Sequence, residues 1–286
     1  MSGLLSFNGK IIRSDEFCIS PQNRAFRYGD GVFETIRIHR GITLWEDLHF
    51  KRLQTAATKL HLNMLHGWSA ESFSGYLTEL YKANHKQDKA ARVRLSLFRN
   101  DGGLYSPYTN NASLLIESEP LDQDAFALNA IGLTIGVYDK IYKPFNALSS
   151  LKSINAQIYV LACIHKRDKG LGDMLLLNDQ GMIAEATSSN VFIAKNGQLF
   201  TPALSQACVE GVMRAVVIGL AGDIGMRVNE TKISLNDLED ADEVLLTNAI
   251  QGIRWVRQFN HKKYQNKIAT ELVEALNLAV IARFRM

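Results

Sequence analysis

The chain has 286 residues, of which 47% are apolar and 21% charged, a composition typical of a globular protein with room for two modest domains. Its net charge of +3 comes from scattered basic residues, which argues against a nucleic-acid partner and is compatible with an anionic substrate or cofactor. Three cysteines lack metal-ligand spacing, and the chain has neither a signal-peptide pattern nor a membrane-length apolar run, so we expect a cytoplasmic protein without a metal site or a membrane partner.

The first 119 residues are expected to form a domain of strands and helices. Asn8-Gly9 and Arg40-Gly41 separate short apolar stretches and predict hairpin turns, and Ser69 is a suitable N-cap for a helix. The elements expected in chain order are strands at 4–7, 11–12, 32–38 and 43–44, helices at 46–60 and 69–83, and strands at 92–97 and 114–117.

The segment Pro120–Asp124 is short, polar and acidic, and residues 120–126 are the expected linker to a second domain over 127–286. The elements expected there are a strand at 132–137, an irregular segment at 138–150, a helix from near Ser153 to before Gly170, strands separated by turns near 179–181 and 196–197, a helix at 210–222, a strand at 244–246 and a closing helix at 267–283. This order mixes α and β without the regular βαβ alternation of a doubly wound sheet.

Lys152 is the first candidate for chemistry. It follows Leu151 and precedes Ile154, at the point where an irregular segment is expected to become a helix. Burial among apolar residues would lower the pKa of the lysine, which suits the formation of a Schiff base. The alternative is a solvated lysine at a helix start, which is the more common situation for a lysine.

Glu185 is the second candidate, because it is an isolated acidic residue among small residues between two strand-like stretches. A carboxylate in such a place could bind the N–H of a pyridinium ring and keep that ring electron-withdrawing. The alternative is an ordinary glutamate in a loop or on an edge strand.

Three segments are candidates for binding an anionic group. Arg52, inside the expected helix 46–60, offers a guanidinium fork that matches phosphate oxygens. Gly211 opens a helix whose first backbone N–H groups can bind an anion, and the loop 247–250 follows a strand end. The alternatives are an exposed helix arginine, an ordinary helix N-terminus and an ordinary loop.

Taken together and in order, these segments resemble the fold-type IV pyridoxal-phosphate enzymes, the class IV aminotransferases. That family includes branched-chain aminotransferases, D-amino acid aminotransferases and 4-amino-4-deoxychorismate lyases. The similar segments are Arg27–Arg37 (the opening motif), His49–Leu53 (the phosphate-arginine helix), Leu151–Ser153 (the Schiff-base lysine), Glu185–Phe192 (the pyridine-binding glutamate) and Gly211–Arg214 (the phosphate loop). The resemblance covers nearly the whole chain.

The resemblance implies an α+β fold with a small N-terminal α/β domain over 1–119 and a larger domain of barrel-like sheet with helices over 127–286. It implies pyridoxal 5′-phosphate as the cofactor, a small amino compound as the substrate and a homodimer that shares its active sites. Its residue roles, carried onto this sequence, are Lys152 for the covalent bond, Glu185 for the ring nitrogen, Arg52 with Gly211, Val212 and Met213 for the phosphate, and Thr247, Asn248 or Ala249 to complete the phosphate site.

The resemblance leaves two reactions open, both of which pass through an external aldimine and a quinonoid with Lys152 as general base. Elimination would make the protein a 4-amino-4-deoxychorismate lyase, favoured by the loops at 99–106 and 247–250 and by Gln157 where branched-chain transaminases usually have a tyrosine. Proton return to the cofactor would make it a transaminase for branched-chain or other amino acids with 2-oxoglutarate. A third hypothesis is a cofactor-free binding protein. The candidates for substrate binding are Tyr28, Arg37, Arg99 and Tyr105.

Overall fold

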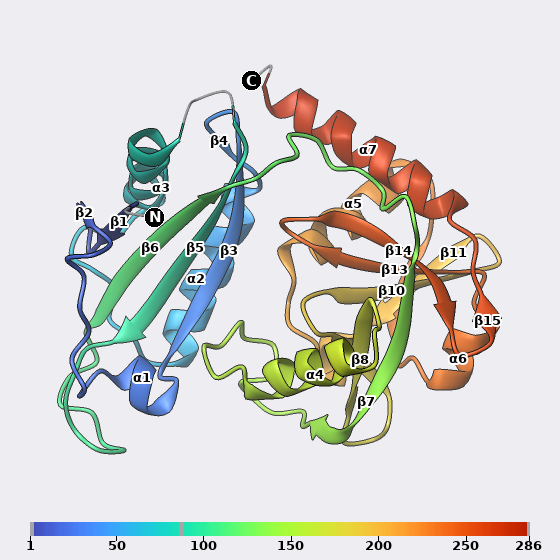
Figure 1. Ribbon diagram of the computed structural model, residues 1–286, viewed down its shortest axis with the longest axis horizontal. Coiled ribbons are helices and arrows are strands. Elements are labelled where there is room, and N and C mark those ends of the chain that lie inside the picture. The colour runs from blue at the N-terminus through green and yellow to red at the C-terminus, as the bar shows by residue number, and fades with distance from the viewer. Residues whose placement is uncertain (1–2, 86–88, 285–286) are drawn as a thin grey trace. The chain divides into compact units, whose positions relative to one another are not determined.

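The computed structural model describes residues 3–85 and 89–284, and these fall into two compact units (Figure 1). Unit 1 comprises Met1–Asp124 together with Leu151–Asn155, and unit 2 comprises Ala125–Ser150 and Ala156–Met286. The short segment that carries Lys152 therefore belongs to the first unit although it follows part of the second in the chain. The division into domains at 120–126 stays a prediction, because compactness does not establish independent folding.

Unit 1 is built on an antiparallel sheet that has six strands within the described residues, in the order β2-β1-β6-β5-β3-β4. Its elements are β1 (Leu4–Phe7), β2 (Lys10–Arg13), α1 (Arg24–Tyr28), β3 (Gly31–His39), β4 (Ile42–Thr43), α2 (Glu46–Lys59), α3 (Ala70–Asn84), β5 (Ala91–Arg99) and β6 (Ala112–Pro120). Each strand and helix expected before residue 119 is present, with small differences at the ends.

Local sequence signals explain several of these elements. Asn8 and Gly9 both have positive φ, as do Arg40 and Gly41, which confirms the two predicted hairpin turns. The Ser69 hydroxyl accepts a hydrogen bond from the Ser72 N–H, and the Ser72 hydroxyl caps Ser69 in return. The predicted N-cap of α3 is therefore confirmed.

The core of unit 1 lies between one face of the sheet and the helices α2 and α3. Ile36 of β3 and Leu95 of β5 pack there with Leu53 of α2 and Leu77 of α3, all of them almost fully buried. Because side chains alternate along a strand, Phe33 on β3 and Arg94 on β5 belong to the opposite face of this sheet. The Phe33 ring on this second face is a contact of Lys152.

Unit 2 contains a larger sheet that has nine strands within the described residues, in the order β12-β11-β10-β13-β14-β7-β8-β9 with β15 beside β14. Its elements are β7 (Leu133–Lys143), α4 (Gln157–Asp168), β8 (Asp173–Asn178), β9 (Ile183–Ala186), β10 (Asn190–Lys195), β11 (Gln198–Pro202), α5 (Val212–Asp223), β12 (Val228–Thr231), α6 (Leu235–Asp240), β13 (Glu243–Asn248), β14 (Gly252–Phe259), β15 (Lys262–Lys263) and α7 (Lys267–Arg283). The end strand β9 also lies against β10, so the sheet curls toward a barrel (Figure 1).

Two expectations for the middle of the chain are wrong. The segment expected to be irregular at 138–150 instead continues β7 as far as Lys143. Residues 139–142 are all exposed, so no alternation of buried and exposed side chains marks this part of the strand. The helix expected near Ser153 begins only at Gln157, because Lys152 and Ile154 form backbone hydrogen bonds with the start of β3 and Ser153 forms a bridge with Val32. The closing helix at 267–283 is confirmed.

None of the helices within residues 3–85 and 89–284 combines the length and the apolar character that crossing a bilayer requires.

Candidate active site

Lys152 lies in unit 1, on the extended segment beside β3. The backbone N–H of Phe33 donates to the carbonyl oxygen of Lys152 at 2.9 Å, and the N–H of Ile154 donates to that of Gly31 at 3.0 Å. Lys152 is half-buried, and its Nζ lies 4.3 Å from the centre of the Phe33 ring, within the range of a cation–π interaction. Strand β3 therefore fixes both the backbone and the amine of this lysine.

A buried cluster of Glu34, His49 and Arg52 joins β3 to α2. Nε of Arg52 donates to Oε1 of Glu34 at 2.7 Å, and Nδ1 of His49 lies 2.7 Å from Oε2. Burial alone would raise the pKa of Glu34, but the charge of Arg52 and the hydrogen bonds from Arg52 and His49 outweigh it and lower the pKa to about 2. Glu34 is therefore ionised, and it fixes the orientation of Arg52, the predicted phosphate ligand.

His49 is the member of this cluster with unused hydrogen-bonding capacity. Burial lowers the pKa of His49, and the nearby charges of Arg52 and Lys152 act in the same direction against Glu34. The imidazole is therefore neutral near pH 7 and carries its proton on Nδ1, toward the carboxylate. Its Nε2 is buried and has no hydrogen-bond partner among the described residues.

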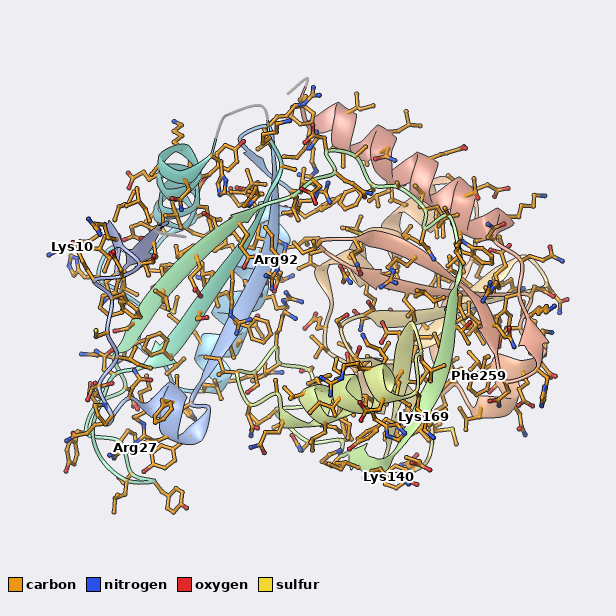
Figure 2. All side chains as sticks on the ribbon, in the orientation of Figure 1. Lys10, Arg27, Arg92, Lys140, Lys169 and Phe259 are labelled. Atoms are coloured by element: carbon orange, nitrogen blue, oxygen red, sulfur yellow. The ribbon has the colours of Figure 1, made fainter. Side chains whose placement is uncertain are left out.

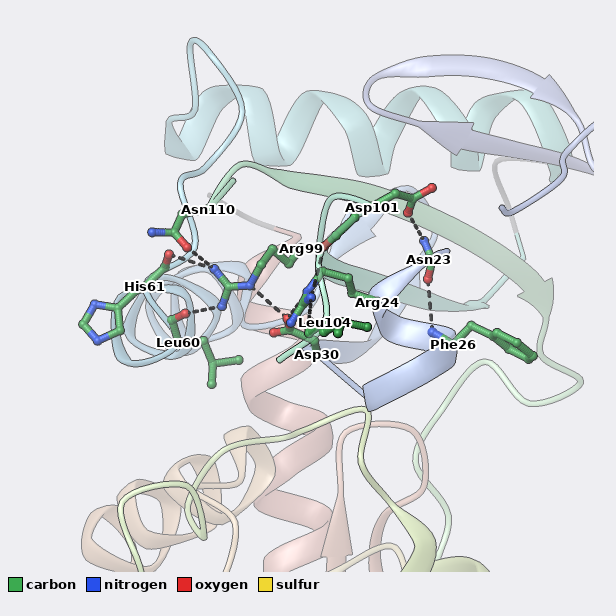
Figure 3. Close-up of polar contacts among 11 residues, drawn as sticks. Asn23, Arg24, Phe26, Asp30, Leu60, His61, Arg99, Asp101, Leu104 and Asn110 are labelled. Carbon is green, nitrogen blue, oxygen red and sulfur yellow. Dashed lines mark hydrogen bonds and ion pairs between the residues drawn. The ribbon is translucent and has the colours of Figure 1, made fainter. Parts of the chain in front are cut away.

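Arg99, a predicted substrate ligand, is instead engaged by the protein (Figure 3). Its Nε and that of Arg24 both donate to Oδ2 of Asp30, at 2.9 and 2.8 Å. Its Nη atoms donate to the Asn110 side chain and to the carbonyl of Leu60, at 2.6 and 2.7 Å. Arg99 therefore holds the loop after β5 and the end of α2 in place.

The other predicted substrate ligands make contacts of their own within unit 1. Arg37 is buried and donates to the backbone carbonyls of Gln123 and Asp124. Tyr105 is 90% exposed, and its ring lies 5.6 Å from that of Tyr28, which is half-buried. The assignment of these residues to the substrate stays a prediction, and for Arg37 and Arg99 the observed contacts do not favour it.

Glu185 lies in unit 2, on β9, and its side chain is almost fully buried. Lys143 of β7 and the Tyr159 hydroxyl of α4 donate to its Oε1, at 2.5 and 2.6 Å, and the N–H of Val209 donates to Oε2 at 2.9 Å. Lys143 also donates to the carbonyl of Ser149, three residues before Lys152. Burial, together with the charge of Glu185, raises the pKa of Tyr159, which therefore stays a hydroxyl donor.

The start of α5 is shaped by Asn190 of β10. The Nδ2 of Asn190 donates to the carbonyl of Val209 at 2.8 Å, while its Oδ1 lies so close to Gly211 that a Cβ there would collide with it. Gly211 is the N-cap and has no side chain with which to cap the amides of α5. Val212 and Met213 are the first residues of the helix, so their backbone N–H groups have no acceptor within the helix and can donate to an anion.

Thr247 lies directly opposite Asn190 in the pairing of β10 with β13. Directly paired residues project from the same face of a sheet, so the Thr247 hydroxyl lies on the side from which Asn190 reaches Gly211. This hydroxyl is buried and has no hydrogen-bond partner within the described residues. Thr247 and the start of α5 therefore form one place, here called the anion site, that can bind an oxyanion.

The neighbours of Thr247 play different parts. The Asn248 side chain donates to Ser189 at 3.1 Å and accepts from the N–H of Gln251 at 2.8 Å, so it closes the turn after β13. Ala249 is half-buried in that turn.

Within the described ranges, no group of three or more His, Cys, Asp or Glu side chains is placed to hold a metal ion.

Several residues of the site were not predicted from the sequence. Lys143 and Tyr159 come to Glu185 from β7 and α4, and Glu34 comes from β3 to bind both Arg52 and His49 of α2. Only His49 had a signal, because it stands three residues before Arg52 on the same helix and so shares its face.

The chain is similar to known proteins over most of its length. Residues 31–259 match the family model described as amino-transferase class IV. A putative branched-chain-amino-acid aminotransferase of Methanocaldococcus jannaschii is 29% identical over 94% of this chain and 92% of its own. An aminodeoxychorismate lyase of Bacillus subtilis is 28% identical over 87% of this chain and 84% of its own.

A solved structure supports the fold. The crystal structure of an aminotransferase from Brucella abortus bound to the cofactor PLP matches with a TM-score of 0.83 and 22% identity, over 98% of this chain and 99% of that one. The fold is therefore the fold-type IV architecture expected from the sequence. Because the family model spans most of the chain, this protein belongs to the class IV aminotransferases and is an enzyme of that family.

Proposed function

We propose that this protein binds pyridoxal 5′-phosphate and that Lys152 carries it covalently. The observation that supports the proposal most directly is the anion site in unit 2, where the buried Thr247 hydroxyl and the first backbone amides of α5, which begins at a glycine N-cap, fit a phosphate group. Membership of the class IV aminotransferases supports the same cofactor.

The residues present also fit the other parts of the cofactor. Lys152 would hold its aldehyde carbon, and the guanidinium of Arg52 is suited to its phosphate. Glu185 would hold its ring nitrogen, because Oε2 of Glu185 accepts only the Val209 N–H among the described residues, and a carboxylate oxygen can accept two hydrogen bonds.

When bound, the cofactor withdraws electrons from the substrate carbon that bears the amino group, and so makes the proton on that carbon acidic. Nζ of Lys152 is the group that would accept this proton, a role typically worth about 10²–10⁴-fold in rate. Lys143 and Tyr159 hold the Glu185 carboxylate in one orientation through Oε1, which would leave Oε2 available to the ring nitrogen.

For the overall reaction we propose elimination from 4-amino-4-deoxychorismate to give 4-aminobenzoate and pyruvate. Gln157, five residues after Lys152, is exposed at the first turn of α4, and the nearest tyrosine, Tyr159, donates its hydroxyl to Glu185. The tyrosine that branched-chain transaminases usually have at position 157 is thus missing. The lyase name of the Bacillus subtilis relative agrees with this choice.

Transamination of an α-amino acid with 2-oxoglutarate is the second candidate. The observation that favours it is the Methanocaldococcus jannaschii relative, which is named as a branched-chain aminotransferase and aligns over 94% of this chain.

Attachment of the cofactor can be tested by borohydride reduction of the purified protein after incubation with pyridoxal 5′-phosphate. We expect one stable adduct, located on Lys152 by peptide mass spectrometry and lost in Lys152→Ala. Lys140→Ala removes an exposed lysine, 64% accessible in its side chain, and should keep the adduct. An adduct that persists in Lys152→Ala would contradict the assignment.

The two reactions are separated by supplying each substrate to the same preparation. The lyase proposal predicts formation of 4-aminobenzoate and pyruvate from 4-amino-4-deoxychorismate, and little glutamate from leucine with 2-oxoglutarate. Rapid glutamate formation without 4-aminobenzoate would establish the transaminase instead.

A further inference from the structure

We propose that a cavity in unit 1 binds a small organic cation whose charge lies on an alkylated ammonium group. The cavity has a volume of about 260 Å³ and is lined by β1, the segment before α1, the end of β5 with the loop after it, and β6. A cavity of about 150 Å³ already accommodates benzene, so this one has room for a compact organic molecule. None of the described residues assigned to the cofactor or the substrate lines it, so the inference goes beyond the proposed function.

Three phenylalanines form the apolar part of this cavity. Phe7 ends β1, Phe98 lies on β5 and is almost fully buried, and Phe17 comes from the segment that leads to α1. The ring centres of Phe7 and Phe17 lie 5.3 Å apart, with 53° between the two ring planes. Aromatic rings attract an ammonium group, and the alkyl groups on its nitrogen can pack against the same rings. Three rings around one cavity therefore suit an alkylated ammonium.

Asp101 supplies the cavity with a negative charge. Its Oδ1 accepts from Nδ2 of Asn23 at 3.1 Å (Figure 3). Asn23 is itself fixed, because it is 5% exposed and its Oδ1 accepts from the Phe26 N–H at 3.1 Å. Within residues 3–85 and 89–284, Oδ2 of Asp101 has no partner and no Lys, Arg or His lines the cavity. A cationic ligand would therefore find an uncompensated carboxylate beside the aromatic rings.

Asn100 adds a hydrogen-bond donor. The Ser113 hydroxyl donates to Oδ1 of Asn100 at 2.7 Å, and Nδ2 of Asn100 has no acceptor in the described part of the chain. Ser113 is 8% exposed and pairs directly with Phe98 in the sheet, so the orientation of Asn100 is held from a rigid strand. A hydroxyl oxygen on the ligand can accept from Nδ2. The cavity thus suits an alkylated ammonium that also carries one polar oxygen.

Choline and 3,3-dimethyl-1-butanol are the probes, because they have nearly the same shape and only choline is charged. Titration calorimetry should show that choline binds the original protein about tenfold more tightly than the alcohol does, or tighter still. The nitrogen of choline has no N–H bond and cannot form a Schiff base. The result therefore does not depend on Lys152 or on pyridoxal 5′-phosphate, and loss of the Lys152 adduct would leave this comparison unaffected.

Asp101→Asn removes the charge and keeps an oxygen that can accept from Asn23. We expect it to weaken choline binding about threefold or more and to leave binding of the alcohol unchanged. Phe17→Leu should also weaken choline binding, because leucine keeps an apolar contact without an aromatic face. Asp15→Asn is the control, since Asp15 lies close to Phe17 in the chain but pairs with Arg13 and does not line the cavity.

Cys18 can report where choline binds. Its thiol is exposed and lines the cavity, so choline should slow the alkylation of Cys18 by iodoacetamide in proportion to the fraction of protein occupied. Cys163, on α4 in unit 2, is the internal control and should react at an unchanged rate.

Several results would overturn the proposal. These are equal affinity for choline and the alcohol, equal affinity of Asp101→Asn and the original protein for choline, and Cys18 alkylation that choline does not slow. Absence of choline binding would overturn it as well. If Cys18 then reacts only after dilution of the protein, a second copy of the chain covers the cavity instead.

Discussion

Among single residues, Asp30 is the carboxylate that joins two arginines at one end of unit 1. It accepts from both Arg24 and Arg99, and these two arginines in turn hold the carbonyls of Leu104 and Leu60 (Figure 3). Burial alone would raise the pKa of Asp30, but the two arginines outweigh it and lower the pKa below 3.8. One carboxylate thus organises a loop and a helix end.

Asp30→Asn should cost about 3 kcal/mol of unfolding free energy near pH 7, because two largely buried guanidinium groups lose their counter-ion. A lowered folded-state pKa gives stability that is present above the unfolded value of 3.8 and lost as the pH falls below it. Urea unfolding from pH 7 to pH 2.5 should therefore show the difference between the two proteins shrinking only below about pH 4. A difference that stays constant with pH would show that Asp30 acts through its shape rather than its charge.

Lys143 offers a second prediction for a single residue, since it gives the buried Glu185 its only cationic partner within the described residues. Lys143→Met should lower the unfolding free energy by about 3–5 kcal/mol, because it leaves a buried carboxylate uncompensated. Lys143→Met with Glu185→Gln should recover part of that loss. Lys140→Met, in an exposed pair on the same strand, is the control and should change little (Figure 2). Additive losses in the double variant would contradict the coupling.

For secondary-structure elements, the sequence predicted best what short-range chemistry determines. The hairpins at Asn8-Gly9 and Arg40-Gly41 follow from positive φ, and α3 follows from the Ser69 cap, so each could be recognised from adjacent residues. The segment around Lys152 could not, because Ser153 resembles a helix start while the decisive hydrogen bonds come from β3, more than a hundred residues earlier.

The start of α5 is an element whose geometry depends on one cross-strand neighbour. Gly211 has φ −73° and ψ 134°, which alanine tolerates, so only the contact with Asn190 excludes a side chain. Gly211→Ala should cost about 1–3 kcal/mol and weaken binding of inorganic phosphate, because the helix start must move.

The same contact provides the control for that prediction. Asn190→Ala with Gly211→Ala should be no less stable than Asn190→Ala alone, since the collision is removed. Gly219→Ala, in the same helix with open space around its Cβ position, should be neutral or slightly stabilising. Equal effects of Gly211→Ala and Gly219→Ala on urea unfolding and phosphate titration would exclude the proposed role of Asn190.

At the scale of the whole molecule, the sequence predicted the mixed α and β architecture and the order of its motifs, since both follow from patterns along the chain. It could not predict the partners of each candidate. Glu185 meets Lys143 and Tyr159, and Arg52 meets Glu34, only because separate elements pack together. The same limit explains Arg37 and Arg99, whose residue types suggested ligands but whose donors are used by backbone and side-chain oxygens of the fold.

Association with a second copy of the chain is the last expectation, and the surface of unit 1 offers support for it. Four large apolar side chains on α1 and on the loop after β5 are strongly exposed: Phe26, Leu104, Tyr105 and Tyr108, at 72%, 74%, 90% and 85%. The loop is nevertheless fixed at its base, because Arg24 donates to the carbonyls of Gly102 and Leu104. A fixed, exposed group of apolar side chains is typical of a protein–protein interface.

We therefore expect a dimer of 32.0 kDa chains, and expect Leu104→Ser with Tyr105→Ser to weaken its association at least tenfold, or about 1.4 kcal/mol. Sedimentation velocity over a dilution series measures this directly.

Ile131→Ser is the control, because Ile131 in unit 2 is exposed to the same 74% as Leu104 but lies outside this group. The loop substitutions remove side chains that touch little within their own chain, so unfolding free energy should stay unchanged while association falls. A dimer equally stable in both variants would place the interface elsewhere, and a monomer at all concentrations would mean that the active site is complete within one chain.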